Sequence, residues 1–481
     1  MMMRNMRRRS VLSVVIVGFA MLVPAWSAPL QAQLSSAQDP ILKWNAIALQ
    51  AVADDHSGTF GEPNQKGPTR TARALAIMHI AAYDAVNTIV GGYEPYLAVS
   101  VLPKATIKKA SLNAAVAQAA HDTLVVLYPR QASVFLRALL LDLKGVPLNK
   151  GRIEGILVGK IAALNILIAR INDGSNTPDV AFPVGPSVIG IHQPDPLNPN
   201  QGLHVPRWGE VTPFAIDSVE NFHAPAPPQP DSDNEVERMA YALAYDEVLR
   251  LGGDGIITPT QRTVEQSEIG VFWAYDGAIG LGTPPRLYNQ IARTIAMQER
   301  NTVAQNARLF ALLNIAQADA GIACWYTKYQ YNFWRPIIGI RSGDYDDNEF
   351  TDGDPSWMAL GAPATNRSNG GINFTPPFPA YTSGHATFGA AAFQTLAHLY
   401  GDRYNFQFTS DEFNGRNTDS QGRVRPIRIR RFTSFSQASA ENARSRVYLG
   451  VHWQFDADMG VAIGNEVADH VFEEYLSPVS R

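Results

Sequence analysis

Apolar residues recur at helical spacing, at positions i, i+3, i+4 and i+7, in most of the long segments of this chain. The segments with this pattern are 70–89, 109–128, 133–143, 151–172, 234–251, 259–275, 287–298, 301–333 and the last forty residues. Runs that alternate polar and apolar residues, as strands do, are scarce. The pattern predicts an all-α protein whose helices pack as two bundles of the four-helix type.

Two stretches lack this periodicity and are rich in Pro, Gly, Asn and Asp, namely 173–232 and 341–382. Loops of that length inside a compact protein usually line a functional site or are partly disordered. We expect an N-terminal helical half over 40–260 and a C-terminal half over 261–478 that carries the site, with the long loops around it.

The overall composition is that of a globular protein without a strong charge bias. Of 481 residues, 46% are hydrophobic and 17% are charged. The formal net charge of −4 gives no sign of nucleic-acid binding. Cys324 is the only cysteine, so internal disulfides are impossible, and thiolate metal sites and iron–sulfur clusters are not expected.

The first 33 residues have the features of a secretory signal peptide. A basic start is followed by an apolar stretch from Val11 to Val23 and then by small residues. Arg8 and Arg9 loosely fit a twin-arginine signal, and an uncleaved membrane anchor is the alternative. We therefore expect an exported protein, periplasmic or secreted. No later run approaches 18 apolar residues, so the mature chain is expected to have no membrane span.

Residues 376–393, PPFPAYTSGHATFGAAAF, place Ser-Gly-His where a helix begins. The prolines before it cannot continue a helix, so the helical pattern starts only near Ser383. Ser383, Gly384 and His385 would then lie at a helix N-terminus, where unpaired N–H groups and the helix dipole favour an anion. The alternative is an ordinary Ser-capped helix with a surface histidine.

A lysine and an arginine precede this stretch in WYTKYQYNFWRP, residues 325–336. Lys328 and Arg335 are seven residues apart, almost two helical turns, so we expect both on one face of a helix that ends at Pro336. Such a pair suits a tetrahedral oxyanion, to which arginine offers a planar fork and lysine a point charge. The alternative is two cations that snorkel from an apolar surface.

The segment SRVYLGVHWQFDAD, residues 445–458, supplies another arginine and a histidine. His452 and Asp456 have i, i+4 spacing, which lets the carboxylate face the imidazole and select its tautomer. Arg446 lies six residues before His452, about 120° away on a straight helix. If both serve one site, the helix must break between them, and we expect the break at Gly450. The alternative is a mere surface pair.

The order of these three segments resembles the signature of the vanadium-dependent haloperoxidases and the type 2 phosphatidic acid phosphatase superfamily. The shared pattern is Lys, six residues, Arg-Pro; then Ser-Gly-His; then Ser-Arg, five residues, His, three residues, Asp. The resemblance extends to FWAYDG (272–277) and TPPRLYNQIA (283–292) and covers roughly 260–475. Upstream of this region, the N-terminal half matches only as an array of helices.

Within the superfamily the chain looks most like the chloroperoxidase branch. Trp325 lies three residues before the lysine and Phe378 seven residues before the histidine of Ser-Gly-His. The resemblance implies that these two aromatic side chains form a halide pocket. One departure is Thr382, where the usual pattern has proline before Ser-Gly-His. It changes the loop but removes no ligand.

The resemblance also implies vanadate as the cofactor and gives each matched residue a role. His452 would bind the vanadium, and His385 would transfer protons near it. The groups that would hold the vanadate oxygens are Lys328, Arg335, Ser383, the Gly384 amide and Arg446. Lys328 would also activate peroxide, and Asp276 would orient Arg446 or a neighbouring polar group. The implied reaction is the oxidation of a halide by hydrogen peroxide to hypohalous acid.

A soluble, exported acid phosphatase is the alternative function for the same residues. Phosphate would occupy the site, His452 would be the nucleophile and His385 would protonate the leaving group of a phosphate ester. Vanadate resembles the transition state of phosphoryl transfer, so one site suits both reactions. The missing membrane spans argue against a lipid phosphatase. The aromatic side chains of Trp325 and Phe378, which would form an apolar wall for a halide, favour the peroxidase. A catalytically silent anion-binding protein is the third hypothesis.

Overall fold

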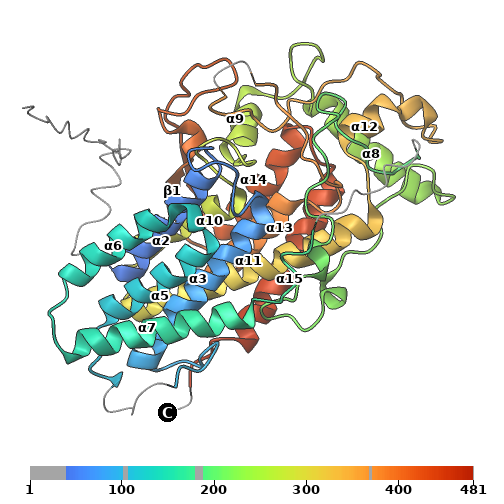
Figure 1. Cartoon of the computed structure of the whole chain (residues 1–481). Helices are drawn as coiled ribbons and strands as arrows, with labels where there is room; N and C mark the ends of the chain where they lie inside the picture. Colours follow the sequence, from blue (N-terminus) through green and yellow to red (C-terminus); the bar gives the residue numbers. More distant parts are fainter. Residues whose placement is uncertain (1–38, 101–106, 179–187, 368–370, 480–481) are drawn as a thin grey trace, which may run out of the picture. The chain divides into compact units, whose positions relative to one another are not determined.

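Helices dominate the residues that the computed structural model describes, which are 39–100, 107–178, 188–367 and 371–479 (Figure 1). The first helices are α2 (Pro40–Asp55), α3 (Gly67–Val90), α5 (Leu112–Leu127), α6 (Ala132–Lys144) and α7 (Lys150–Ala169). The next are α8 (Glu235–Leu251), α9 (Val264–Phe272), α10 (Pro284–Gln298), α11 (Val303–Tyr331) and α12 (Pro336–Arg341). The last are α13 (Gly384–Tyr400), α14 (Phe435–Tyr448) and α15 (Gln454–Glu474). Two strands, β1 (Phe406–Thr409) and β2 (Ile429–Phe432), form one antiparallel pair.

The all-α prediction is confirmed for the described chain, but two helices were not expected from the pattern. Helix α2 is buried on almost every side, so its apolar residues form no single stripe that stands out in the sequence. Helix α12 has only six residues, too few to display a helical period. The expected signal peptide, 1–33, lies outside the described residues.

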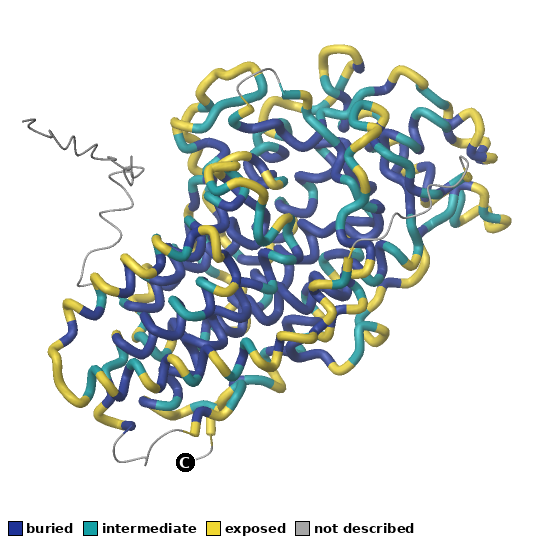
Figure 2. The backbone as a smooth tube through the Cα atoms, in the orientation of Figure 1, coloured by how far each residue is buried: buried dark blue, intermediate teal, exposed yellow. Residues whose placement is uncertain are grey.

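Helix α11 lies at the centre of residues 39–481, which form one compact unit. On one side α11 packs against α3, which in turn packs against α5 and α7. On the other side α11 packs against α13 and α15, and α14 packs against both of these. We call α3, α5, α6 and α7 the N-terminal bundle and α13, α14 and α15 the C-terminal bundle. Figure 2 shows that the buried residues continue from one bundle to the other.

Among the described residues, α11 is the one helix whose length and composition would allow it to cross a membrane. However, 94% of its apolar window is buried inside the protein. Its apolar side chains are therefore used by the two bundles that pack around it, as in the core helix of a globular protein.

Glycines let the helices of both bundles approach closely. A Cβ atom on Gly159 of α7 would lie 2.3 Å from the Ala115 carbonyl oxygen of α5. A Cβ atom on Gly464 of α15 would lie 2.4 Å from the Thr387 carbonyl oxygen of α13. Both distances are far below van der Waals contact, so each crossing depends on a glycine.

Candidate active site

Helix α13 begins where the sequence predicts. Ser383 is its N-cap residue, and its hydroxyl accepts a hydrogen bond from the Ala386 amide at 3.4 Å. The Ser383 amide donates to the Asp456 carbonyl oxygen at 2.8 Å, which ties the start of α13 to the start of α15. His385, in the first turn, is buried. The alternative of a surface histidine is therefore wrong.

The expectation that Lys328 and Arg335 share one helix face is wrong. Asn332 takes a left-handed conformation, with φ of 48°, and ends α11 at Tyr331. Arg335 is instead the N-cap residue of α12, which Pro336 begins. Asparagine tolerates this conformation better than most residues, and proline suits the first turn of a helix, so the local sequence favours a break here. Spacing alone could not reveal it.

Lys328 and Arg335 nevertheless reach the same stretch of backbone, residues 378–382. The Lys328 ammonium group donates to the carbonyl oxygens of Pro379 at 2.8 Å and Ala380 at 3.0 Å, and also to that of Thr382. The Arg335 Nε donates to the Phe378 carbonyl oxygen at 2.9 Å. Both cations are fully buried, so they hold the loop before α13 from behind and are not snorkelling side chains.

Burial has a strong effect on the charged form of Lys328. Desolvation, together with the positive charges of Arg335 and Arg446, lowers the pKa of Lys328 to about 7. Its ammonium group lies 5.6 Å from the ring centroid of Trp325 and 5.1 Å from that of Phe378. These two expected halide-pocket residues therefore border the lysine as well, and each ring offers a cation–π contact.

The helix that carries Arg446 ends before Gly450, where the sequence predicts a break. Helix α14 ends at Tyr448, Gly450 has a φ of 68°, and α15 begins only at Gln454. A Cβ atom on Gly450 would lie 2.5 Å from the Gly252 carbonyl oxygen. Glycine is thus required here both for the left-handed backbone and for the space it leaves.

The two nitrogens of the His452 ring have different partners. Nδ1 donates a hydrogen bond to Oδ2 of Asp456 at 2.9 Å, as the spacing predicts. Nε2 is then the basic nitrogen, and it faces Nη1 of Arg335 at 2.9 Å. Burial and three nearby cations lower the pKa of His452 well below its usual value. The ring is therefore neutral and keeps a lone pair on Nε2.

Asp276 holds Arg446 as predicted. The Arg446 guanidinium donates two hydrogen bonds to the Asp276 carboxylate, at 2.8 Å and 3.1 Å. The same carboxylate lies 3.8 Å from Nε2 of His385, which also contacts the Ala274 carbonyl oxygen. Desolvation and the charge of Arg446 lower the pKa of His385 to about 4, so this ring is neutral near pH 7.

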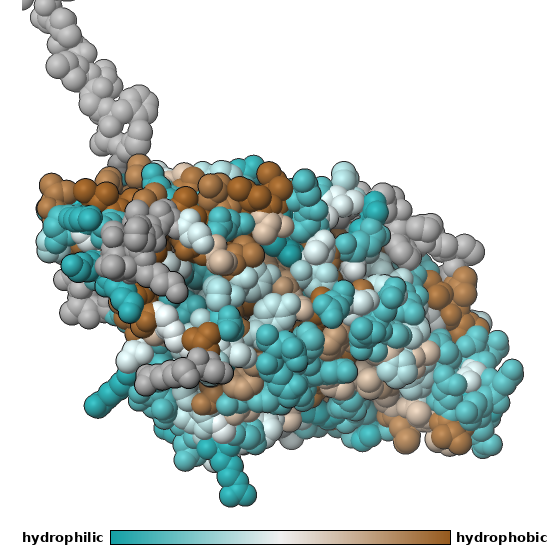
Figure 3. Space-filling model, turned by 90° about the horizontal axis from the view of Figure 1, so that it is seen from below, coloured by the Kyte–Doolittle hydropathy of each residue, from teal (hydrophilic) through white to brown (hydrophobic). Residues whose placement is uncertain are grey.

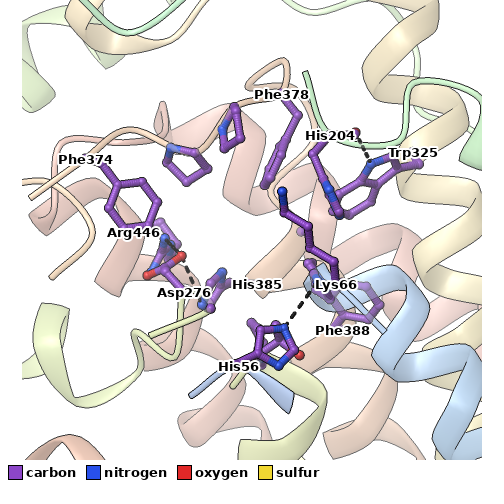
Figure 4. A pocket seen from close by; sticks show the side chains of 18 of the residues that line it. His56, Lys66, His204, Asp276, Trp325, Phe374, Phe378, His385, Phe388 and Arg446 are labelled. Atoms are coloured by element: carbon purple, nitrogen blue, oxygen red, sulfur yellow. Dashed lines mark hydrogen bonds and ion pairs between the residues drawn. The ribbon is translucent and has the colours of Figure 1, made fainter. Parts of the chain in front are cut away.

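A cavity of about 240 Å³ opens onto part of this cluster. Its polar side includes Asp276, Gly384, His385, Arg446 and His452. Its apolar side consists of prolines and aromatic rings, namely Trp325, Phe374, Pro376, Pro377, Phe378 and Phe388. Figure 4 shows Asp276, His385 and Arg446 on one side and Phe378, Trp325 and Phe388 on the other, with Phe374 beside Arg446. Lys328, Arg335 and Ser383 do not line the cavity but lie directly behind its wall.

The N-terminal half also contributes to the cavity, which the sequence did not reveal. His56 and Lys66, from the segment between α2 and α3, line it together with His204. The Lys66 side chain reaches into the space between His385 and the aromatic wall (Figure 4). None of the three belongs to a motif, and the only signal was the length of the loop 173–232, which contains His204.

His204 is built into the aromatic wall. Its ring centroid lies 6.2 Å from that of Phe378 and 6.4 Å from that of Trp325. The His204 amide donates to the Pro377 carbonyl oxygen at 2.9 Å. The His204 carbonyl oxygen accepts a hydrogen bond from the Tyr329 hydroxyl at 2.8 Å. The long loop therefore positions the proline-rich segment, which confirms that this loop lines the site.

The cluster has more positive charge and more donors than its own residues use. Lys328, Arg335 and Arg446 are fully buried. Within the described part of the chain, Asp276 is the one carboxylate that forms an ion pair with any of these three cations. Among the described residues, Nη2 of Arg335 and Nε of Arg446 are buried without a hydrogen-bond partner. Unused buried donors are costly unless a ligand satisfies them. The arrangement therefore fits a compact oxyanion.

The chain is similar to known proteins over most of its length. The family model of the VCPO second helical-bundle domain matches residues 308–481. The vanadium chloroperoxidase of Curvularia inaequalis is 33% identical over 492 residues, which cover 87% of this chain and 79% of that protein.

Two solved structures resemble the fold. The first bacterial vanadium-dependent iodoperoxidase aligns with a TM-score of 0.70 at 24% sequence identity, covering 91% of this chain and 98% of that one. A holo-type bacterial vanadium-dependent chloroperoxidase aligns with a TM-score of 0.63 at 16% identity, covering 87% and 95%. At these identities the structural likeness concerns the arrangement of helices.

Proposed function

Since the chain belongs to the vanadium haloperoxidase family, we propose that its buried site binds vanadate and oxidises a halide with hydrogen peroxide to hypohalous acid. The observation that carries this proposal is that one buried site contains both unused donors, on Arg335 and Arg446, and a basic nitrogen, Nε2 of His452. Two guanidinium groups suit the oxygens of an oxyanion, and a neutral imidazole suits its metal centre.

The residues at the site fit vanadate in charge and in donor type. His452 would bind the vanadium through Nε2, while Lys328, Arg335, Arg446, Ser383 and the Gly384 amide would hold its oxygens. Bound vanadate would supply a Lewis-acidic centre that activates hydrogen peroxide. Asp456 would keep the His452 proton on Nδ1, and Asp276 would keep Arg446 in place, so both carboxylates act through the groups that they position.

His385 is the group best placed to take up a proton. Its lowered pKa of about 4 leaves the ring neutral near pH 7. Its Nε2 contacts the Ala274 carbonyl oxygen, so Nε2 carries the hydrogen and Nδ1 is the basic nitrogen. The ring lines the cavity from which hydrogen peroxide would arrive. His385 would therefore accept a proton from hydrogen peroxide and return it to the product.

Vanadate loading is the direct test of the proposed function. The metal-free protein should gain peroxide-dependent bromination when vanadate is added, with about one vanadium per chain by elemental analysis. Free phosphate should compete with vanadate, because both are tetrahedral oxyanions that seek the same donors. Vigorous hydrolysis of an activated phosphate ester that vanadate does not inhibit, with no halogenation at any loading, would favour the phosphatase alternative instead.

For the halide, we propose that the chain oxidises chloride as well as bromide. Trp325 and Phe378 lie 5.0 Å apart between ring centroids, and Phe378 sits over Arg335 at 4.9 Å. The Trp325 indole N–H is directed at the His204 carbonyl oxygen and Phe378 has no polar group, so these two rings offer no free donor that would stabilise negative charge on the oxidant. Phe378→His adds one, so chloride turnover should fall more than bromide turnover. Equal losses for both halides would contradict this assignment.

We also propose that the protein is exported. The support is the signal-like pattern of residues 1–33 together with the single cysteine, Cys324, which leaves the chain independent of disulfide formation. Fractionation of producing cells should find the enzyme outside the cytoplasm, with an N-terminus near residue 33. Intact chain retained in the cytoplasm would contradict it.

A further inference from the structure

The outer face of α7 carries an apolar stripe that no part of the described chain covers. Ile153, Leu157, Leu164, Ile168 and, just past the end of the helix, Ile171 are exposed. They recur every three, four or seven residues and therefore lie along one side of the helix. The opposite side of α7, with its glycines, packs against α5. The exposed stripe thus plays no role in holding the N-terminal bundle together.

Helix α6 and the turn that follows it expose further apolar residues at the same end of the molecule (Figure 1). Leu136, Leu140 and Leu141 of α6 are exposed, and Leu148 in the turn is 83% exposed. We call these four residues and the five of α7 the α6–α7 face. Figure 3 shows hydrophobic residues gathered along the upper left of the view, at the end of the molecule where Figure 1 places α6 and α7. Nine large apolar side chains exposed at one end of the molecule are unusual for a monomeric protein.

Basic side chains interrupt and border the face. Lys160 lies on the α7 stripe between Leu157 and Leu164, and α6 contributes Arg137 and Lys144. All three cations are exposed, and none of them makes an ion pair with another described residue. The face is therefore apolar and positive at the same time.

The acidic side chains of the same helices point inward. Asp142 of α6 pairs with Lys43 and accepts a hydrogen bond from the Trp44 indole at 2.8 Å. Glu154 of α7 is buried, with a long ion pair of 3.5 Å to Lys150. Neither carboxylate can balance the exposed cations, although the whole chain has a net charge of −4. The positive charge is thus a local property of this surface.

We propose that the α6–α7 face docks onto the surface of an anionic lipid bilayer. Leucine and isoleucine side chains would enter the boundary between headgroups and acyl chains, as in interfacial amphipathic helices. Lys160, Arg137 and Lys144 would extend their charged ends to anionic headgroups, which their flexible stems permit. This docking is independent of the peroxide chemistry and concerns a different end of the molecule from the cavity.

A second copy of the chain fits the face less well. Two-fold pairing would place equivalent surfaces against each other. Lys160, within the stripe, would then approach the other copy's basic side chains, and the exposed residues of α6 and α7 include no acidic group to pair with it. The two occupants respond to salt in opposite directions, because salt screens attraction to anionic lipid but also screens repulsion between two basic faces.

Co-sedimentation with lipid vesicles tests the proposal. Every variant is made in the full chain, so residues 1–38 are present in all samples and cannot cause a difference between them. The protein should pellet with vesicles that contain phosphatidylglycerol and much less with pure phosphatidylcholine vesicles. Binding should fall severalfold between about 50 mM and about 500 mM salt. Lys160→Gln should weaken binding about fivefold, and a double variant, Leu157→Ser with Leu164→Ser, about tenfold or more.

Leu243→Ser is the matched control, because Leu243 on α8 is also highly exposed but lies outside the face. It should bind as the parent does, and circular dichroism and halogenation should show that every variant is folded. Vesicle binding that the Lys160 and leucine variants retain in full would overturn the proposal. Absence of binding, combined with a dimer that tightens as salt increases, would assign the face to a second copy instead.

Discussion

The two helix bundles that share α11 both contain close crossings at glycines but differ in the polar groups that they bury. In the N-terminal bundle, His79 has its pKa lowered to about 3, bonds to Asn45 at 2.9 Å and stacks on Phe310. Its neutral ring is used for packing. Beside the C-terminal bundle, three cations and two histidines are buried together around donors that lack partners. Helix packing thus supplies the scaffold in both bundles, whereas unbalanced buried charge marks the site.

The largest expected effect separates the two buried histidines. His452→Ala should lower halogenation by about a thousandfold or more and abolish vanadium retention, because it removes the proposed metal ligand. His79→Gln is the matched change in the N-terminal bundle. It should lower the free energy of unfolding by about 1–3 kcal/mol and leave activity per folded molecule unchanged. Steady-state kinetics, vanadium content and chemical denaturation of both variants measure the contrast. Loss of vanadium from the His79 variant would contradict the assignment of His79 to packing alone.

Two buried arginine–carboxylate groups allow a second comparison. Asp276→Asn leaves Arg446 without its counter-ion, and Asp173→Asn removes the carboxylate that Arg170 contacts at 3.0 Å and Arg73 at 2.7 Å. Each change should lower the free energy of unfolding by roughly 3 kcal/mol. Saturating phosphate should restore part of this loss only in the Asp276 variant, because an anion replaces the missing charge there. Thermal unfolding with and without phosphate checks this, and equal rescue of both variants would contradict the assignment of the anion site.

The close helix crossings give a third contrast. Gly159→Ala and Gly464→Ala each insert a methyl group against a backbone oxygen, at 2.3 Å and 2.4 Å. Each should cost about 1–3 kcal/mol of stability. Gly464 faces Thr387 in the first turns of α13, so its variant should also raise the vanadate concentration needed for half-maximal activity. The Gly159 variant should not. Vanadate titration of the two proteins decides whether the site depends on the α13–α15 crossing.

The smallest expected effect concerns the titration of Lys328. Its pKa of about 7 means that, above pH 7, the free site must take up a proton before it presents an ammonium group to an anion. Anion affinity should therefore fall as pH rises, by up to about tenfold between pH 7 and about pH 8.5. Lys328→Arg keeps its charge over this range and should show a flatter dependence. Calorimetry should measure phosphate binding to both proteins over this pH range. Phosphate titrates in the same way in both experiments, so its own contribution cancels when the two pH dependences are compared. Parallel curves would contradict the role of Lys328.

Much of this fold could be predicted from the chain because most helices have one apolar side. The pattern located α3, α5, α7 and α11 to within a few residues. It failed for α2, whose burial on almost every side removes the contrast between faces. It also joined α11 to Arg335, because the left-handed turn at Asn332 is invisible in an apolar period. Periodicity reports which side of a helix is buried but not where the backbone turns.

Of the site, the residues within motifs were predictable and the isolated ones were not. The i, i+4 spacing of His452 and Asp456 correctly indicated their hydrogen bond, since one helical turn brings such residues together. His56, Lys66 and His204 reach the cavity from segments far from the motifs. Nothing local distinguishes them from other loop residues. Their positions depend on how the N-terminal half packs against α11.

Four features could be read from the amino-acid sequence alone: the helical class, Ser383 as the cap of α13, the break at Gly450 and a set of residue types that suits an oxyanion. Each of these follows from interactions within a few residues, such as capping, backbone conformation and helical spacing. The approach of Lys328 and Arg335 to the site from two different helices became visible only in the folded chain. The same holds for the pairing of Arg446 with Asp276, which lies 170 residues away in the sequence. Such contacts arise from the packing of distant segments in a low-dielectric interior, where an unpaired charge is costly and a partner must come from wherever the fold places one.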